Sequence, residues 1–394
     1  MQSLPPPKDA LAAATHPDPY PFYAGLLGER PLYRDTALGM WVASSAQAVT
    51  EIFMSRLCRV RPEGEPVPAH LGTSAAGLLF GRLVRMNDGQ EHARLKRAVL
   101  QTLGSIEVAH AEALSRACAY ALASERLPGA GTESVDDFVF QLPVHVLGLL
   151  LGLPPSTFRM VAQGVEDYVG AFAPGASKAC LQRASAGATA LLELFGAQLA
   201  SSDANGLLAR LQEEALGVGP LGRDVVVANA IGFLSQAYEA TAGLTGNTLL
   251  ALAAQPALAL ALHRQPPLLD DALAEVLRHD PPVQNTRRFV AADGVVAGEK
   301  MQAGDVILLV LAAANRDPLA NPEPHRFEVC RQARRTFGFG SGLHLCPGQA
   351  LSMAIARAAV ERVLCVGVPL GELRRTARYR PSFNLRIPRF GKGD

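Results

Sequence analysis

One helical stretch of unusual length dominates the second half of the sequence. Residues 223–254 begin at the end of GPLGRD, run to Gln255-Pro256, and are apolar on most faces of a helix. A helix that is apolar almost all round lies inside a large protein. The chain of 394 residues exceeds the usual size of a single core, so its length allows either two ordinary domains or one large fold. The apolar stretch predicts a helix buried through the middle of a large protein.

Helical periodicity marks four further segments, and strand patterns are few. The predicted helices cover residues 92–103, 107–124, 188–200 and 268–279, and the predicted strands cover 294–296 and 306–310, both in the second half. No shift in composition or low-complexity linker separates the halves. We therefore predict a mainly α fold with a small β portion, built as a single domain over residues 1–394, with residues 1–18 as an irregular tail.

The charge balance, the cysteines and the N-terminal segment limit the binding partners and the cell compartment that we expect for this protein. The 37 Lys and Arg residues balance 36 Asp and Glu residues, so no overall field attracts nucleic acid or an anionic membrane. The six cysteines lie far apart without a CxxC pair, which argues against a zinc knuckle or a disulfide framework and favours the cytoplasm. The N-terminus lacks the pattern of a signal peptide, so we expect no membrane association.

The segment FGFGSGLHLCPGQALSMAIARAAVERVL carries the strongest chemical signal. Glycines precede a single cysteine, Cys346, and an amphipathic helix follows it. The N-terminus of a helix stabilises an anionic sulfur, and Gly342 and Gly348 let the backbone lie flat against a planar ligand. The alternative is a buried structural cysteine beside a glycine-rich turn.

The order of residues in this segment resembles the haem-binding signature of the cytochrome P450 family, F-x-x-G-x-H-x-C-x-G. The matching residues are Phe339, Gly342, His344, Cys346 and Gly348. The resemblance implies haem b with Cys346 as its proximal thiolate, His344 bonded to a propionate, and Phe339 packed beneath the ring. It also implies a triangular prism of helices, with the haem between the long central helix and the helix that follows the cysteine loop.

Glu275 and Arg278 resemble a second family motif, E-x-x-R. Three residues apart, they lie on one face of a helix and can form an ion pair. Alone, such a pair is usually a solvated surface salt bridge. In the family it is buried and holds the segment before the cysteine loop, and Arg326 of PHRF resembles the third member of that network.

Further positions resemble the residues that bind the haem propionates. Arg288 opens RFVAAD, where the family places such an arginine, and Arg287 is the competing candidate. The segment MNDGQEHARLKRAV resembles the helix that provides a histidine and an arginine, here His92 and Lys96. Lysine keeps the charge of arginine but loses its fork of donors.

The long helix departs from the family where oxygen is activated. The segment SQAYEATAGLTGN resembles A-G-x-D/E-T-T/S, with Glu239 at the acidic position and Ala240 where the family has an alcohol. Thr241 follows, rotated by about 100° around the helix axis. Three alternatives stay open. The substrate supplies a hydroxyl that orders water, one of Thr241, Gln236 and Tyr238 partly replaces the alcohol, or the chemistry does not need the usual efficient O–O heterolysis.

The leading functional hypothesis is a haem-thiolate monooxygenase that acts on a small, largely apolar molecule and receives electrons from a separate ferredoxin and ferredoxin reductase. Arg334, Arg335 and Arg357 flank the cysteine loop and are expected to attract the ferredoxin. Oxidative coupling, desaturation or peroxide-driven oxidation is the alternative that Ala240 favours, and a non-catalytic haem-binding protein is a remote one. By resemblance, the substrate pocket includes Phe233, Gln236, Ala237, Val283, Thr286 and Phe383.

Overall fold

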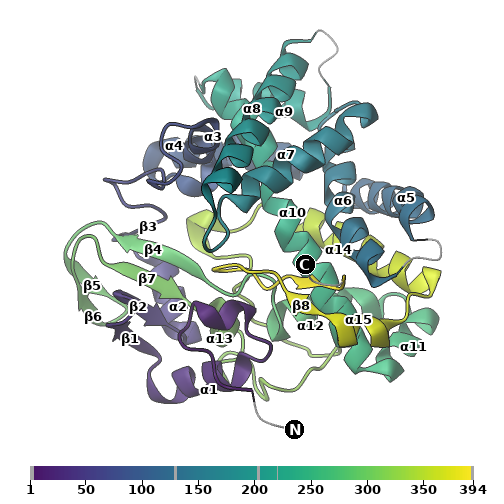
Figure 1. Ribbon diagram of the computed structural model, residues 1–394. Coiled ribbons are helices and arrows are strands. Elements are labelled where there is room, and N and C mark those ends of the chain that lie inside the picture. The colour runs from purple at the N-terminus through teal and green to yellow at the C-terminus, as the bar shows by residue number, and fades with distance from the viewer. Residues whose placement is uncertain (1–3, 128–130, 202–204, 220, 392–394) are drawn as a thin grey trace.

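The computed structural model describes residues 4–127, 131–201, 205–219 and 221–391 (Figure 1). The longer helices are α1 (Tyr20–Glu29), α2 (Ala46–Met54), α3 (Ala75–Arg82), α4 (Gly89–Gly104), α5 (Val108–Arg126), α6 (Thr132–Leu150), α7 (Phe158–Gly170), α8 (Lys178–Ala200), α9 (Gly206–Gly217), α10 (Arg223–Ala254), α11 (Pro256–Arg264), α12 (Leu268–His279), α13 (Leu311–Ala314), α14 (Gln349–Val366) and α15 (Leu370–Thr376). Four 3-10 turns accompany them, η1 (Ala12–Thr15), η2 (Val84–Met86), η3 (Pro155–Thr157) and η4 (Gly342–His344).

The strands form three small sheets. They are β1 (Leu32–Asp35), β2 (Met40–Ala43), β3 (Cys58–Arg59), β4 (Thr286–Val290), β5 (Gly294–Val296), β6 (Glu299–Met301), β7 (Val306–Leu309), β8 (Arg378–Tyr379) and β9 (Pro388–Arg389). The largest sheet has the order β1-β2-β7-β4-β3, and β2 pairs with β7 in parallel, with Trp41 opposite Ile307. The prediction that strands lie in the second half is therefore wrong for β1, β2 and β3, because strands of two to four residues are too short to show a clear alternation.

The long helix α10 has the bounds that the sequence predicts and passes through the centre of the helical part of the molecule (Figure 1). It contacts α6, α8, α9, α12 and α14. Most of its side chains are buried, which explains why it is apolar on nearly every face. The prediction of a mainly α fold with a small β portion is confirmed.

The N-terminal segment is less irregular than the sequence predicts. Residues Ala12–Thr15 form η1, and Ala10 and Ala13 are fully buried in a cluster with Val42 and Leu308 of the large sheet. Alanine methyl groups are small enough to pack closely on a sheet without a long periodic helix that the sequence could reveal.

No single helix among the described residues is both long enough and apolar enough to cross a membrane. The helix α10 and residues 256–262 together have the length and apolar composition for it, but they are bent by 113°.

Candidate functional site

The cysteine loop is a tight backbone structure that ends at the start of α14. Gly340 and Gly342 have φ values of +73° and +64°, in the left-handed region that favours glycine. The amide of Cys346 donates to the carbonyl of Phe339 at 2.8 Å, which closes the loop. Gly348 caps α14, and a Cβ atom there would lie 4.0 Å from the Cys346 sulfur. The residues of the sequence signature thus form a loop that places the Cys346 sulfur beside the N-terminus of α14.

The ionisation of Cys346 depends on opposing effects. Burial raises the pKa of the thiol, whereas a hydrogen bond from the Gly348 amide and the charge of Lys96 lower it. The effect of burial is the larger one, so the pKa of Cys346 is raised and the helix terminus alone does not keep the sulfur anionic. A metal ion does so when it binds, because a coordinated thiol loses its proton outright.

Imidazole and cationic groups gather on the side of this loop that faces α4. The rings of His92 and His344 lie 4.2 Å apart, and His344 Nε2 lies 3.1 Å from Asp88 Oδ1. Burial and the charges of His344 and Lys96 lower the pKa of His92 to about 4. Arg288 is buried, and its guanidinium carbon lies 4.9 Å from the centre of the Phe53 ring. It also interacts electrostatically with Asp88. His344 thus lies between His92 and Asp88, and Arg288 interacts with the same Asp88.

The predicted partners Lys96 and Arg287 are engaged elsewhere. Lys96 Nζ donates to the carbonyl of Leu345 at 2.5 Å, so it braces the cysteine loop directly. Arg287 lies over the ring of Phe383 at 5.7 Å and is half-buried. Of the two neighbouring arginines, Arg288 is the one that interacts electrostatically with Asp88, the partner of His344.

The surroundings of Cys346 fit a planar, anionic group such as haem. The Nε2 atom of His92 is buried and has no hydrogen-bond partner in the described part of the chain. Leu343 and Leu345 of the same loop are 77% and 48% exposed, which is unusual for large apolar side chains. Cysteine thiolate is a known axial ligand of haem iron. Cys346 would hold the iron, and His92, His344 and Arg288 would hold the carboxylates.

Glu275 and Arg278 form a fully buried ion pair behind the cysteine loop. Arg278 Nε and Nη2 donate to the two oxygens of Glu275 at 3.0 and 2.6 Å, and Arg278 Nη1 donates to the carbonyl of Pro324 at 2.8 Å. Burial opposes ionisation of Glu275, but the hydrogen bonds from Arg278 and from the Glu328 amide outweigh it and lower its pKa. The pair is thus not a surface bridge.

The third member of this network is not the side chain of Arg326. Its carbonyl accepts from Arg278 at 2.8 Å, while its guanidinium is 60% exposed and pairs with Glu323. Arg331 and Arg334 instead place their Nε atoms 3.6 and 3.3 Å from Glu275. The local sequence does not show which arginine turns inward, because that depends on how the loop folds over α12.

The arginines that were expected to form a docking surface are also partly engaged. Arg334 belongs to the Glu275 network, and Arg357 lies 3.3 Å from Asp270. Arg335 is exposed and donates to the Thr50 hydroxyl at 2.7 Å. Only Arg335 of the three keeps its charge without a carboxylate partner among the described residues.

One stripe along the middle of α10 stays accessible, in contrast to the rest of the helix. Its members are separated by helical spacing and are Phe233, Gln236, Ala237 and Ala240, with Glu239 at its edge. The side chain of Glu239 is 20% exposed, and its Oε1 lies 3.2 Å from Arg380 Nη1. Burial raises the pKa of Glu239, and Arg380 is the main group that opposes the rise. The acid is therefore paired, not isolated.

The candidate substitutes for the missing alcohol lie on different faces of α10. Thr241 is 1% exposed, and its hydroxyl has no hydrogen-bond partner among the described residues. Tyr238 is also buried, 5.0 Å from the ring of Phe140. Gln236 shares the accessible stripe with Ala240, but its Nε2 donates to the Gly232 carbonyl at 2.9 Å.

The other predicted pocket residues lie at the edge of the sheets. Val283 forms an isolated bridge with Leu385, which places the segment before β4 beside the segment that carries Phe383. Thr286 begins β4, and Phe383 is 41% exposed. These residues remain predictions as substrate contacts.

Sequence reasoning missed two cations near Glu239. Arg380 follows β8, and Arg85 lies in η2; both act electrostatically on Glu239. Arg85 stands alone in the apolar run LVRM, directly before the segment that carries His92, and that isolation was a usable signal. Nothing in the sequence near Arg380 marks its partner.

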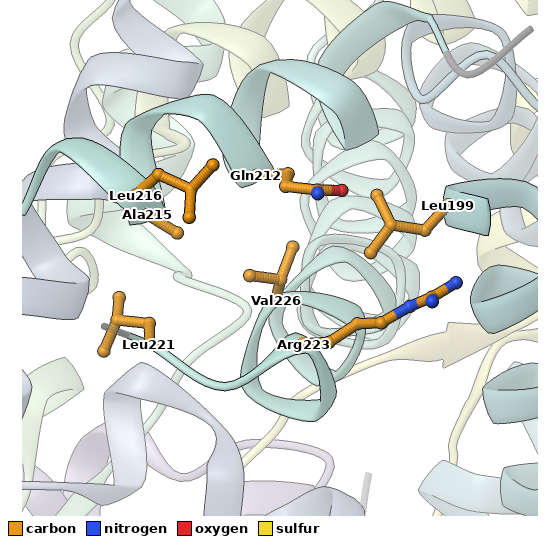
Figure 2. A pocket seen from close by; sticks show the side chains of 7 residues that line it. All are labelled: Leu199, Gln212, Ala215, Leu216, Leu221, Arg223 and Val226. Atoms are coloured by element: carbon orange, nitrogen blue, oxygen red, sulfur yellow. The ribbon is translucent and has the colours of Figure 1, made fainter. Parts of the chain in front are cut away.

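A separate pocket of about 190 Å³ lies where the end of α8, α9 and the start of α10 meet (Figure 2). Its lining includes Leu199, Leu216 and Val226, with Arg223 at one side, and none of the candidate site residues. It is therefore distinct from the space beside Cys346.

Comparisons with known proteins agree with this geometry. The family model "Cytochrome P450" matches residues 225–365. The chain is 28% identical over 380 residues to Vitamin D(3) 25-hydroxylase of Pseudonocardia autotrophica, covering 93% of this chain and 92% of that protein. It is 28% identical over 363 residues to Cytochrome P450 monooxygenase PikC of Streptomyces venezuelae, covering 88% and 83%. The solved structure of P450 RauA, complexed with a biosynthetic intermediate of aurachin RE, aligns with a TM-score of 0.81 at 25% identity and covers 96% of this chain and 97% of that one.

Proposed function

The chain belongs to the cytochrome P450 family, and on this premise we propose that it is a monooxygenase of secondary metabolism that oxidises a small, largely apolar organic molecule. It is an oxidoreductase whose cofactor is haem b with an axial cysteine thiolate. The observation that supports the proposal is the cluster of His92, His344, Asp88 and Arg288 at the loop that also carries Cys346. When bound, the haem supplies oxygen activation, which thiolate donation favours.

Other residues of the chain would bind the haem propionates, support the cysteine loop and contact the substrate. His92, His344 and Arg288 hold the propionates, and the buried pair of Glu275 and Arg278 keeps the cysteine loop in place. Aligned charged donors of this kind orient a carboxylate firmly. The accessible stripe of α10 forms the wall against which an apolar substrate packs.

Glu239 is the proposed proton carrier, and Ala240 leaves its neighbourhood without a hydroxyl. Insertion of one oxygen atom into a C–H bond releases the other atom as water, which consumes two protons and two electrons. Glu239 can take protons from water and pass them on, because its side chain is partly exposed. The substrate or an ordered water then supplies the hydrogen bond that the family's alcohol would give.

The electrons come from partners outside the chain. We propose a ferredoxin with its reductase as the donor and the cytoplasm as the location. The six cysteines support a reducing compartment, since all are free in the structure, including the buried Cys58 and Cys118.

Replacement of the axial ligand tests the proposal. Cys346→Ser should abolish the reduced carbon-monoxide band of a thiolate-ligated haem, because an alcohol does not match the donation of a thiolate. The exposed Cys365 at the end of α14 offers a matched control, since Cys365→Ser should keep the band. An unchanged carbon-monoxide band in Cys346→Ser would show that Cys346 is not the axial ligand.

Ala240 gives specific support to a second candidate, peroxide-driven oxidation or oxidative coupling. Such reactions depend less on delivered protons than electron-driven oxygen insertion does. Turnover with a ferredoxin system should exceed turnover with hydrogen peroxide if the first function holds, and the reverse order would favour the second. Failure with both donors, in a protein with full haem content, would favour a non-catalytic haem-binding role.

A further inference from the structure

The imidazole of His279, the last residue of α12, is held by two hydrogen bonds that fix where its proton lies. Arg316 Nη2 lies 2.9 Å from His279 Nδ1, and His279 Nε2 lies 3.0 Å from the carbonyl oxygen of His325. A guanidinium only donates and a carbonyl only accepts, so Nδ1 is the acceptor and Nε2 carries the hydrogen. The arrangement therefore requires a neutral imidazole in one tautomer.

Arg316 is fixed from several sides next to this ring. It is 6% exposed, and its Nε and Nη2 atoms donate to the carbonyl of His279 at 2.8 and 2.6 Å. Its guanidinium carbon lies 3.4 Å from the centre of the Tyr20 ring. Tyr20 donates to Asp280, which also lies 2.8 Å from Arg386 Nε. A proton added to Nδ1 of the imidazole would thus place two N–H groups and two positive charges against each other.

The charges around His279 oppose its protonation on balance. Burial and the charge of Arg316 lower the pKa of His279 to about 4, although the His325 carbonyl and Asp280 act in the opposite direction. The charged and titratable groups that surround the ring and its immediate partners are Tyr20, Arg278, Asp280, Arg316, His325 and Arg386. An unfolded chain has a histidine pKa near 6.5, so it binds a proton that the folded protein does not. Stability is therefore lost as the pH falls from about 6.5 to about 4.

A surface cleft of about 530 Å³ gives solvent access to this network. Its lining includes Asp18, Tyr20, His279, Arg316 and His325. The imidazole can therefore exchange protons with water while the protein stays folded. The cleft also provides space for the ring when it leaves Arg316.

His279 and the residue before it anchor the same segment of the chain. Arg278 donates to the carbonyls of residues 324 and 326 at 2.8 Å, and His279 donates to the carbonyl between them. Three successive carbonyls are thus bound by two neighbouring side chains at the end of α12. This segment leads into the loop that supplies Arg331 and Arg334 to Glu275.

The residue next to Arg316 connects this network to the cysteine loop. Asn315 Nδ2 donates to the carbonyl of Leu277 at 2.8 Å, and Asn315 Oδ1 accepts from the amide of Phe337 at 2.8 Å. Two residues later, the carbonyl of Phe339 accepts from the amide of Cys346. A displacement of Arg316 therefore acts on the backbone that supports the sulfur.

We propose that His279 is an acid-sensitive latch of the haem site: its protonation displaces Arg316, separates residues 315–337 from the end of α12, and releases haem from the cysteine loop. The latch is closed while the imidazole is neutral and opens in acid. This inference goes beyond the proposed function, because it concerns retention of the cofactor and not the reaction.

Acid titration of the purified holoenzyme tests the latch. The Soret band reports haem retention as the pH is lowered, and urea unfolding reports stability at pH 7 and pH 5. His279→Gln keeps one acceptor and one donor but cannot ionise, so it should lose haem at a lower pH than the unchanged protein does. Between these two pH values, its ratio of folded to unfolded protein should fall by about tenfold less.

His325→Gln is the matched control, because it removes an imidazole from the same cleft and leaves the carbonyl that His279 binds. This variant should lose haem at the same pH as the unchanged protein. The same pH of haem loss in His279→Gln and the unchanged protein, or an equal shift in both variants, would overturn the inference.

Hydrogen exchange at the C2 carbon of each histidine, followed by mass spectrometry of the unchanged holoenzyme, needs no variant. Exchange at His279 should titrate well below the ordinary range of a histidine. Titration of His279 in the ordinary range would reject the latch even if His279→Gln did not fold. Failure of the proposed function would appear differently, as a missing carbon-monoxide band at neutral pH.

Discussion

Glu239 of the central helix and Arg380 after β8 form an ion pair, with 3.2 Å between Oε1 and Nη1. Each side chain is about one-fifth exposed. This pair joins the C-terminal segment to the middle of α10. It makes the charge state of Glu239 dependent on a residue far away in sequence.

The pH dependence of coupled turnover should change when Arg380 is removed. Burial raises the pKa of Glu239 and Arg380 lowers it, so Arg380→Gln should raise it further. If the ionised carboxylate is the active form, activity falls as pH decreases through this pKa, and the acid limb should move to higher pH. Glu239→Gln should abolish the limb. An acid limb at the same pH in Arg380→Gln would show that Glu239 does not set it.

Loss of the buried pair behind the cysteine loop should prevent stable haem binding. Glu275→Ala leaves Arg278 buried without its carboxylate, which costs about 3–5 kcal/mol. Haem content and the free energy of unfolding measure the effect. Glu323→Ala breaks an exposed pair of the same three-residue spacing and should cost about 1 kcal/mol or less. Equal effects of the two variants would contradict the assigned role.

Installing the family's alcohol should modestly harm the native reaction. Ala240→Thr adds a branched hydroxyl on the accessible stripe of α10, where it competes with substrate or water for space and hydrogen bonds. The measurement is product formed per reductant consumed, together with released peroxide. Thr241→Ala is the control and should change this ratio little, because Thr241 is buried. A large gain in coupled product from Ala240→Thr would mean that the missing hydroxyl is a defect.

Arg335 is the remaining candidate for steering an acidic ferredoxin. Arg335→Glu reverses an exposed charge and should slow ferredoxin-driven reduction at low salt, by about tenfold or less. Substrate affinity should stay the same. Arg326→Glu is a useful comparison, since Arg326 is exposed but already faces Glu323. An unchanged reduction rate for Arg335→Glu at low salt would reject this docking position.

Local patterns predicted the features that depend on neighbouring residues. The bounds of α10 and α12 follow from helical periodicity. The glycines around Cys346 predicted a tight backbone turn, and two of them, Gly340 and Gly342, have positive φ values. Glu275 and Arg278 share a helix turn, so their pairing could be expected. These features need only a few adjacent residues to be recognised.

Contacts between distant segments could not be read in the same way. Arg326, Arg331 and Arg334 belong to one loop, and its path over α12 decides which of them faces Glu275. The partner of Arg380 likewise depends on where β8 and β9 meet α10. A single sequence provides residue types for these pairs but no distances.

The parallel pairing of β2 with β7 also affects how the chain can fold. Trp41 aligns with Ile307, so this strand pair cannot form on a ribosome until most of the chain has been synthesised. Closing such a long loop has an entropic cost, and non-local strand pairing is slow to form. Until then the edge of β2 that faces away from β1 has unpaired backbone groups, which favours aggregation of nascent chains. Slower translation of the first three hundred or so residues would prolong this exposed state, so chaperone dependence during synthesis is the expected physiological consequence.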